Sequence, residues 1–179
     1  MKELSLNILD IAKNSVTAGA SLITVAVKET PERLTIAISD NGCGMTPEFV
    51  ARVTDPFTTT RTTRKVGLGI PLLQMEARQA GGDLKISSQV GVGTETTAWF
   101  DPGNIDMPPL GDLNSSILTL IQGNPELDWV FTHDKNGNSY TLDTREIKEI
   151  MGGISLAEPE ILAWLADYIA ENEAELAGA

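Results

Sequence analysis

Apolar side chains recur over residues 1–100 with two periods, that of an amphipathic helix and that of a half-buried strand. Thr46-Pro47 adds the signature of a helix start, an N-cap followed by proline. In chain order we predict a helix over residues 4–18, strands over 22–28 and 34–40, a short helix over 47–53, a helix over 70–80, and strands over 84–89 and 94–100. This order of elements is typical of an α/β protein.

The pattern changes at a proline-rich stretch, residues 102–109. Beyond it we predict helices over 112–121, 143–151 and 155–175, and strands over 128–132 and 139–142. Asn136-Gly137 between these two strands is a strong signal for a tight hairpin. We therefore divide the chain into a first unit over residues 1–101 and a small α+β unit over residues 110–179.

Charge divides the chain at the same place. Residues 1–100 hold ten basic and ten acidic side chains, whereas residues 101–179 hold three basic and fifteen acidic ones. The whole net charge of −12 therefore comes from the second part. Because an acidic surface repels a phosphate backbone, a general nucleic-acid-binding protein is excluded as an interpretation.

Few residues of the metal-binding and redox types are present. The chain has one cysteine, Cys43, and one histidine, His133, which excludes an internal disulfide and any site built from several cysteines or histidines. We expect His133 to be an ordinary surface or core residue. No apolar run is long enough to span a bilayer, and no signal-peptide pattern follows the first residues. The sequence predicts a cytoplasmic protein without a nucleic-acid or membrane partner.

Three polar features could carry chemistry. Asp10 and Asn14 share one face of the first predicted helix, either as a metal- or water-binding pair or as a solvated stripe. Asp40 ends a strand before Gly42 and Gly44, so its carboxylate could accept from an exocyclic amine while the glycines let a flat ring approach, or the segment is only a tight turn. Residues 67–69, Gly-Leu-Gly, precede a helix whose N-terminus could bind phosphate.

The order and spacing of these features resemble the GHKL ATPase superfamily of DNA gyrase, the heat-shock chaperone ATPase domain, histidine kinases and the mismatch-repair protein MutL. The segments similar to its sequence boxes are DIAKNSVTAGA (10–20), DNGCGM (40–45), DPF (55–57), GLGIPLL (67–73) and GVGTET (91–96). The resemblance covers residues 4–100 and does not extend past residue 101. It implies a two-layer α/β sandwich of the Bergerat type, a mixed sheet with helices on one face, followed here by a C-terminal α+β extension.

The resemblance also implies a role for each matching residue. Asp40 would bind the adenine amine with support from Thr94, and Asn14 would bind Mg²⁺. Asp10 stands where the superfamily usually has a catalytic glutamate, and we expect slow hydrolysis because its side chain is one methylene shorter. The other residues carried over as ATP-binding are Gly42, Gly44, Met45, Phe57, Arg61, Arg64, Lys65, Gly67, Leu68 and Gly69. Of these, Arg61, Arg64 and Lys65 belong to a polar lid that would close on the triphosphate.

Two functions follow from the resemblance. The first is an enzyme that binds Mg-ATP for slow hydrolysis or for phosphotransfer to a separate protein, because no helix pair with an acceptor histidine precedes the ATP-binding segment. The alternative is a non-catalytic, ATP-gated interaction module that presents the acidic unit to a partner. ATP and another protein are the expected partners, and a homodimer is compatible with either function.

Overall fold

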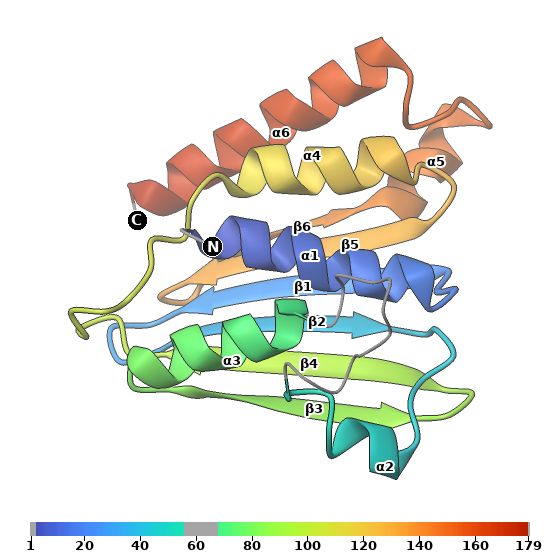
Figure 1. The fold of residues 1–179 in the computed structure, drawn as a ribbon. Coiled ribbons are helices and arrows are strands. Elements are labelled where there is room, and N and C mark those ends of the chain that lie inside the picture. Colours follow the sequence, from blue (N-terminus) through green and yellow to red (C-terminus); the bar gives the residue numbers. More distant parts are fainter. Residues whose placement is uncertain (1–2, 56–67, 179) are drawn as a thin grey trace.

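The computed structural model describes residues 3–55 and 68–178, and within them the chain forms a six-stranded sheet (Figure 1). The strands are β1 (Leu22–Glu29), β2 (Leu34–Asp40), β3 (Asp83–Gln89), β4 (Gly93–Phe100), β5 (Asp128–Lys135) and β6 (Asn138–Asp143). Their order in the sheet is β3-β4-β2-β1-β5-β6. Neighbouring strands are antiparallel except β1 and β5, which are parallel, so the sheet is mixed as predicted.

Helices cover one face of this sheet. They are α1 (Leu4–Thr17), α2 (Pro47–Val50), α3 (Gly69–Gln79), α4 (Leu113–Gly123), α5 (Thr144–Met151) and α6 (Pro159–Ala177). Figure 1 shows α1, α3 and α4 over the same face, with α6 running alongside α4. The predicted two-layer α/β sandwich is therefore confirmed. No helix in residues 3–55 and 68–178 is both long and apolar enough to cross a membrane.

Alternation along the strands explains the two layers. In β1, Ile23, Val25 and Val27 are at most 1% exposed, whereas Thr24 and Ala26 between them are only half-buried. Since successive side chains of a strand point to opposite faces, the apolar set lies under the helices and the other set lies on the uncovered face. The first helix meets this core with the stripe Leu4, Ile8, Ile11, Ser15.

The sheet continues across the proline-rich stretch at 102–109. Strand β5 pairs with β1 along its whole length, from Leu22 opposite Asp128 to Glu29 opposite Lys135. The stretch itself is fixed to the first helix, because the backbone N–H of Leu4 donates to the carbonyl oxygen of Pro109 at 3.0 Å. Residues 1–101 and 110–179 thus share one sheet and one helical layer.

Two elements differ in extent from their predicted ranges. Strand β5 continues to Lys135 instead of ending at residue 132, because β1 supplies a parallel partner for each added residue. Helix α6 begins at Pro159 instead of residue 155. Proline fits the first turn of a helix because it lacks an N–H to donate, and a turn from Ser155 to Glu158 precedes it.

A buried histidine joins the C-terminal helix to the sheet. His133 is 3% exposed, and its Nδ1 and Nε2 atoms each lie 2.7 Å from a carboxylate oxygen, Glu173 Oε2 of α6 and Glu29 Oε1 of β1. The hydroxyl of Tyr140 donates to the same oxygen of Glu173 at 2.6 Å. Burial opposes protonation of the ring, but the two carboxylates outweigh it, so the pKa of His133 is raised above 6.5. His133 is therefore a core residue that ties three elements together.

Candidate functional site

The carboxylate of Asp40 is held at the end of β2 by two hydrogen bonds. Ser15 Oγ of α1 donates to Oδ2 at 2.6 Å, and the backbone N–H of Gly42 donates to Oδ1 at 2.8 Å. The side chain is half-buried, so its orientation is set by the protein instead of by solvent. Each oxygen keeps further lone-pair capacity, because an ionised carboxylate can accept about four hydrogen bonds. Asp40 is thus a fixed acceptor facing the end of the sheet.

The loop after Asp40 needs its two glycines for different reasons. A Cβ on Gly42 would lie 2.9 Å from both the Cβ and the carbonyl oxygen of Ala18, so a side chain would push the loop away from α1. Gly44 has φ of +73°, which side chains with a Cβ rarely adopt, and a Cβ there would overlap the carbonyl oxygen of Gln89. The two glycines therefore let the loop of residues 41–45 pack between the end of α1 and the β3–β4 turn.

Three polar side chains form a row across neighbouring strands. Asp40 of β2 is opposite Thr94 of β4, and Thr94 is opposite Ser88 of β3. All three line a cavity of about 400 Å³ at this end of the sheet, which we call the Asp40 cavity. The next row on the same face contains the buried Ile38 and Thr96. The lining also includes Ser39, Ser87 and Glu95, whose side chains alternate with this row and point to the uncovered face, and it includes no residue of α1 or α3 among those described. The Asp40 cavity therefore lies at the end of the sheet and is open to both faces.

The N-terminus of α3 adjoins the polar stripe of α1. A Cβ placed on Gly69, the first residue of α3, would lie 3.7 Å from the Cβ of Asp10 and 3.6 Å from Cδ1 of Ile11. The N-cap residue Leu68 makes no side-chain hydrogen bond, and no acidic residue occupies the first turn. Within the described part of the chain no side chain caps the first N–H groups of α3, so this helix end can bind an anion.

Asp10 and Asn14 are differently exposed on α1. Asp10 is exposed, whereas Asn14 is half-buried and directly precedes Ser15, the residue bonded to Asp40. No group of three or more His, Cys, Asp or Glu side chains in the described ranges is arranged to hold a metal. The assignment of Asn14 as a Mg²⁺ ligand therefore stays a prediction; Mg²⁺ is usually held by one or two protein oxygens together with water and phosphate.

The structure brings together a large part of the predicted site. Around one end of the sheet and the facing ends of α1 and α3 it gathers Asp10, Asn14, Asp40, Gly42, Gly44, Met45, Leu68, Gly69 and Thr94. The other predicted residues, Phe57, Arg61, Arg64, Lys65 and Gly67, lie in 56–67, outside the described residues.

Sequence reasoning missed two serines of this site. Ser15 is 4% exposed and occupies a position of the apolar stripe of α1, where a polar residue signals a buried hydrogen bond. Ser88 has no comparable signal, because it is one of two consecutive serines in an ordinary strand. Ser15 bonds to Asp40, and Ser88 accepts from the backbone N–H of Met45. The partners are 25 and 43 residues apart in the chain, so only the assembled fold reveals these bonds.

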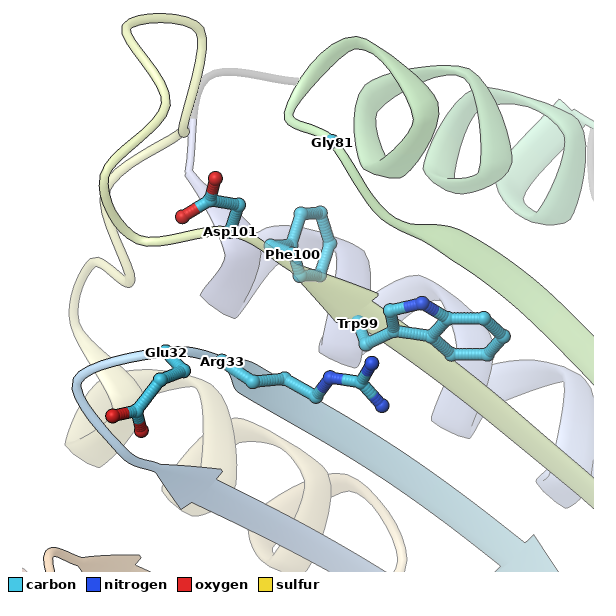
Figure 2. A pocket seen from close by; sticks show the side chains of 6 residues that line it. All are labelled: Glu32, Arg33, Gly81, Trp99, Phe100 and Asp101. Carbon is cyan, nitrogen blue, oxygen red and sulfur yellow. The ribbon is translucent and has the colours of Figure 1, made fainter.

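A second cavity lies at the other end of β2 and β4 (Figure 2). It measures about 430 Å³, and the guanidinium of Arg33 lies over the ring of Trp99 at 5.7 Å from its centroid. The carboxylates of Glu32 and Asp101 flank this pair, and Gly81 and Phe100 complete the lining. None of the predicted site residues that the structure describes borders this cavity.

Residues 1–104, more than half of the chain, match the model of a family described as histidine kinase-, DNA gyrase B- and HSP90-like ATPase. A solved structure titled as the N-terminal domain of a DNA repair protein has a similar fold, with a TM-score of 0.57 and 16% sequence identity. That likeness covers 86% of this chain and 58% of the other, so it extends beyond residues 1–104.

Curated relatives are sensor kinases. The signal transduction histidine-protein kinase AtoS of Escherichia coli is 31% identical over 97 residues, which is 54% of this chain and 16% of the relative. The sensor histidine kinase ZraS of Salmonella typhi is 35% identical over 79 residues, 44% of this chain and 17% of the relative. Sporulation kinase C of Bacillus subtilis is 29% identical over 52% of this chain and 22% of its own length. The chain thus spans less than a quarter of each.

Proposed function

The chain belongs to the histidine kinase-, DNA gyrase B- and HSP90-like ATPase family, and from that premise we propose that it binds Mg-ATP and uses it for slow hydrolysis or for phosphotransfer to a separate protein. One observation carries the proposal: the carboxylate of Asp40 is fixed by Ser15 and Gly42 on the wall of a cavity of about 400 Å³. An acceptor held in this way suits the exocyclic amine of adenine, which is a donor.

The triphosphate would extend from the Asp40 cavity toward α3. The uncapped first turn of α3 offers backbone N–H groups and the positive end of the helix dipole to phosphate oxygens. Asn14 would hold Mg²⁺ through its side-chain oxygen, and the bound ion would neutralise charge on the phosphates. Asp10, which is exposed, and Asn14, which is half-buried, share the polar face of α1, and Asp10 lies beside the first residue of α3. Their side-chain oxygens are donors that suit Mg²⁺.

Asp10 is the proposed catalytic residue. One of its carboxylate oxygens would accept a proton from the attacking water, or from the hydroxyl or imidazole of a partner, as the new bond to the γ-phosphorus forms. The bond from that phosphorus to the oxygen bridging it to the β-phosphate would break, and ADP would leave with that oxygen. Within the described residues no hydrogen bond fixes this carboxylate, and its side chain is one methylene shorter than glutamate. Slow turnover would follow from the shorter side chain, because it places the base less well for the proton transfer than a glutamate would.

The phosphoryl acceptor would belong to a separate protein. His133 is the single histidine of the 179 residues, and both of its ring nitrogens are engaged by Glu29 and Glu173 in the core. It also pairs with Val27 in the strand register, whereas Asp40 pairs with Ile23 at the other end of β1. A buried ring at that end of the sheet does not reach a phosphate bound beside α3.

The alternative function is an ATP-gated interaction module without turnover, and it is favoured by the shorter side chain of Asp10, which has no hydrogen bond within residues 3–55 and 68–178. Calorimetric titration of the 179-residue chain with ATP and Mg²⁺, followed by phosphate release from the same sample, separates the two. The enzyme requires binding that D40N abolishes and slow release that D10N abolishes, with binding by D10N retained. Binding with no release, alone or with candidate partners, establishes the module, and no binding contradicts both.

A further inference from the structure

We infer that Ser88 determines the base specificity of the Asp40 cavity by setting the direction in which the Thr94 hydroxyl donates its proton. This inference rests on the proposed function, since it concerns the purine that the same cavity takes. Ser88 would act as a positioning residue, through Thr94.

The hydroxyl of Ser88 has three polar neighbours. It accepts from the backbone N–H of Met45 at 2.8 Å, it lies 2.7 Å from Thr94 Oγ1, and it lies 3.1 Å from the carbonyl oxygen of Gly93. A serine hydroxyl has one proton, so it cannot donate to Thr94 and to Gly93 together. The direction of the bond between Ser88 and Thr94 therefore has two alternatives.

In the first alternative Ser88 donates to Gly93, and Thr94 donates to Ser88. The Thr94 oxygen then offers only lone pairs to the cavity, next to the acceptor Asp40. In the second alternative Ser88 donates to Thr94, and the Thr94 proton is free for a ligand. The distance of 2.7 Å is the common length of an O–H···O bond, whereas 3.1 Å is beyond its usual range, so giving up the Gly93 contact costs little.

The second alternative matches the edge of adenine. Adenine presents an amine donor at C6 beside the acceptor N1, and Asp40 and Thr94 would then present an acceptor beside a donor. Guanine reverses both groups, with a carbonyl oxygen at C6 and a hydrogen on N1. Because Asp40 and Thr94 are register partners on adjacent strands, the two groups lie side by side as such a pair of contacts requires. Because the N–H of Met45 donates to Ser88, the loop of residues 41–45 also helps to orient the hydroxyl that reads the base.

The test couples Ser88 to a single ligand atom. The 179-residue chain is titrated with ATP and with 1-deaza-ATP, in which a C–H replaces N1, in the presence of Mg²⁺. For the wild type we expect 1-deaza-ATP to bind roughly fivefold more weakly, as loss of one hydrogen bond predicts. In T94V the two ligands should bind with nearly equal affinity, because no hydroxyl remains. In S88A the wild-type difference should shrink, because the Thr94 hydroxyl is no longer fixed by Ser88 and points its proton at N1 only part of the time. S88T retains the hydroxyl and should restore the difference, and S139A, an exposed strand serine far from the cavity, should keep it.

A merely structural role for Ser88 predicts a different result. It would weaken both ligands equally in S88A and leave the wild-type ratio intact, which overturns the inference. If S88A does not fold, S88C decides, since its thiol preserves the size but is a weak donor. A wild type that binds neither ligand refutes the proposed function itself, whereas a wild type that binds ATP with the ratio unchanged in S88A refutes only the role of Ser88.

Discussion

Ser15 and Asp40, 25 residues apart in the chain, are joined by a hydrogen bond of 2.6 Å from Ser15 Oγ to Asp40 Oδ2. This bond connects α1, which carries Asp10 and Asn14, to the strand end that carries the Asp40 carboxylate. This part-buried hydrogen bond, together with the bond from the Cys43 N–H to the Ala18 carbonyl oxygen, joins the proposed metal-binding and base-binding parts of the site. Any change in the position of α1 would be transmitted to Asp40.

Replacing Ser15 by alanine should weaken ATP binding roughly fivefold, because Asp40 loses one of the two donors that fix its orientation. Calorimetric titration measures the dissociation constant, and S139A serves as a matched serine-to-alanine control on an exposed strand position. An unchanged dissociation constant for S15A would mean that the Gly42 N–H alone orients Asp40.

Replacing Asn14 by alanine should remove the effect of Mg²⁺ on ATP binding. The variant in Mg²⁺ should bind ATP no more tightly than the wild type does in a chelator, because the proposed side-chain oxygen ligand is gone. N172A, which changes an asparagine on α6, should keep the full effect. The assignment of Asn14 fails if N14A retains the same dependence on Mg²⁺ as the wild type.

Stability should depend on pH through His133. Burial opposes protonation of the ring, but two carboxylates outweigh it, so the pKa of His133 is raised in the folded protein. Its contribution to folding stability is therefore fully present below about pH 6.5, the pKa of an unfolded histidine. That contribution is lost as the pH rises through the pKa of the folded protein. The pKa of Glu173 is lowered, although burial acts in the opposite direction, by its bonds to His133 and Tyr140. Its contribution is present above the model-peptide value and is lost as the pH falls through the folded value. The bonds of His133 to Glu29 and Glu173 therefore stabilise the fold most in mildly acidic solution.

Urea unfolding at several pH values measures this effect. At pH 6 we expect H133Q to be less stable than the wild type by about 2 kcal/mol, and the difference should shrink as the pH rises. Glu29 and Glu173 bond to the ring directly, and Tyr140 and Lys135 act on Glu173, so E29Q and E173Q should each reduce the pH dependence. A difference between H133Q and wild type that stays constant from pH 6 to pH 9 would show that His133 does not carry charge.

Local patterns were sufficient to predict the elements and their order. Three features depend only on short stretches of sequence. They are the apolar stripe of α1, the Thr46 cap that accepts from the N–H of Phe49, and the Asn136-Gly137 turn with positive φ at both residues. The glycines around Asp40 and at Gly69 were recognisable because backbone approach leaves a direct trace in residue type. These features identify the family and the approximate place of the site.

Contacts between segments that are distant in the chain could not be predicted from local sequence patterns. The parallel pairing of β1 with β5 depends on two apolar strands that are compatible with several partners, so the continuity of the sheet past residue 109 was not predictable. Likewise, His133 has no local feature that points to Glu29 and Glu173, and Ser88 has none that points to Met45. These bonds exist only because the fold closes gaps of many residues.

The central claim is that the Asp40 cavity selects an adenine nucleotide. The most direct measurement is calorimetric titration of the 179-residue chain with ATP and, separately, with GTP, both with Mg²⁺. The account predicts binding of ATP and a loss of affinity for GTP of at least about a hundredfold, because the guanine carbonyl would face the Asp40 carboxylate and leave buried polar groups unpaired. Equal affinity for the two nucleotides would contradict it.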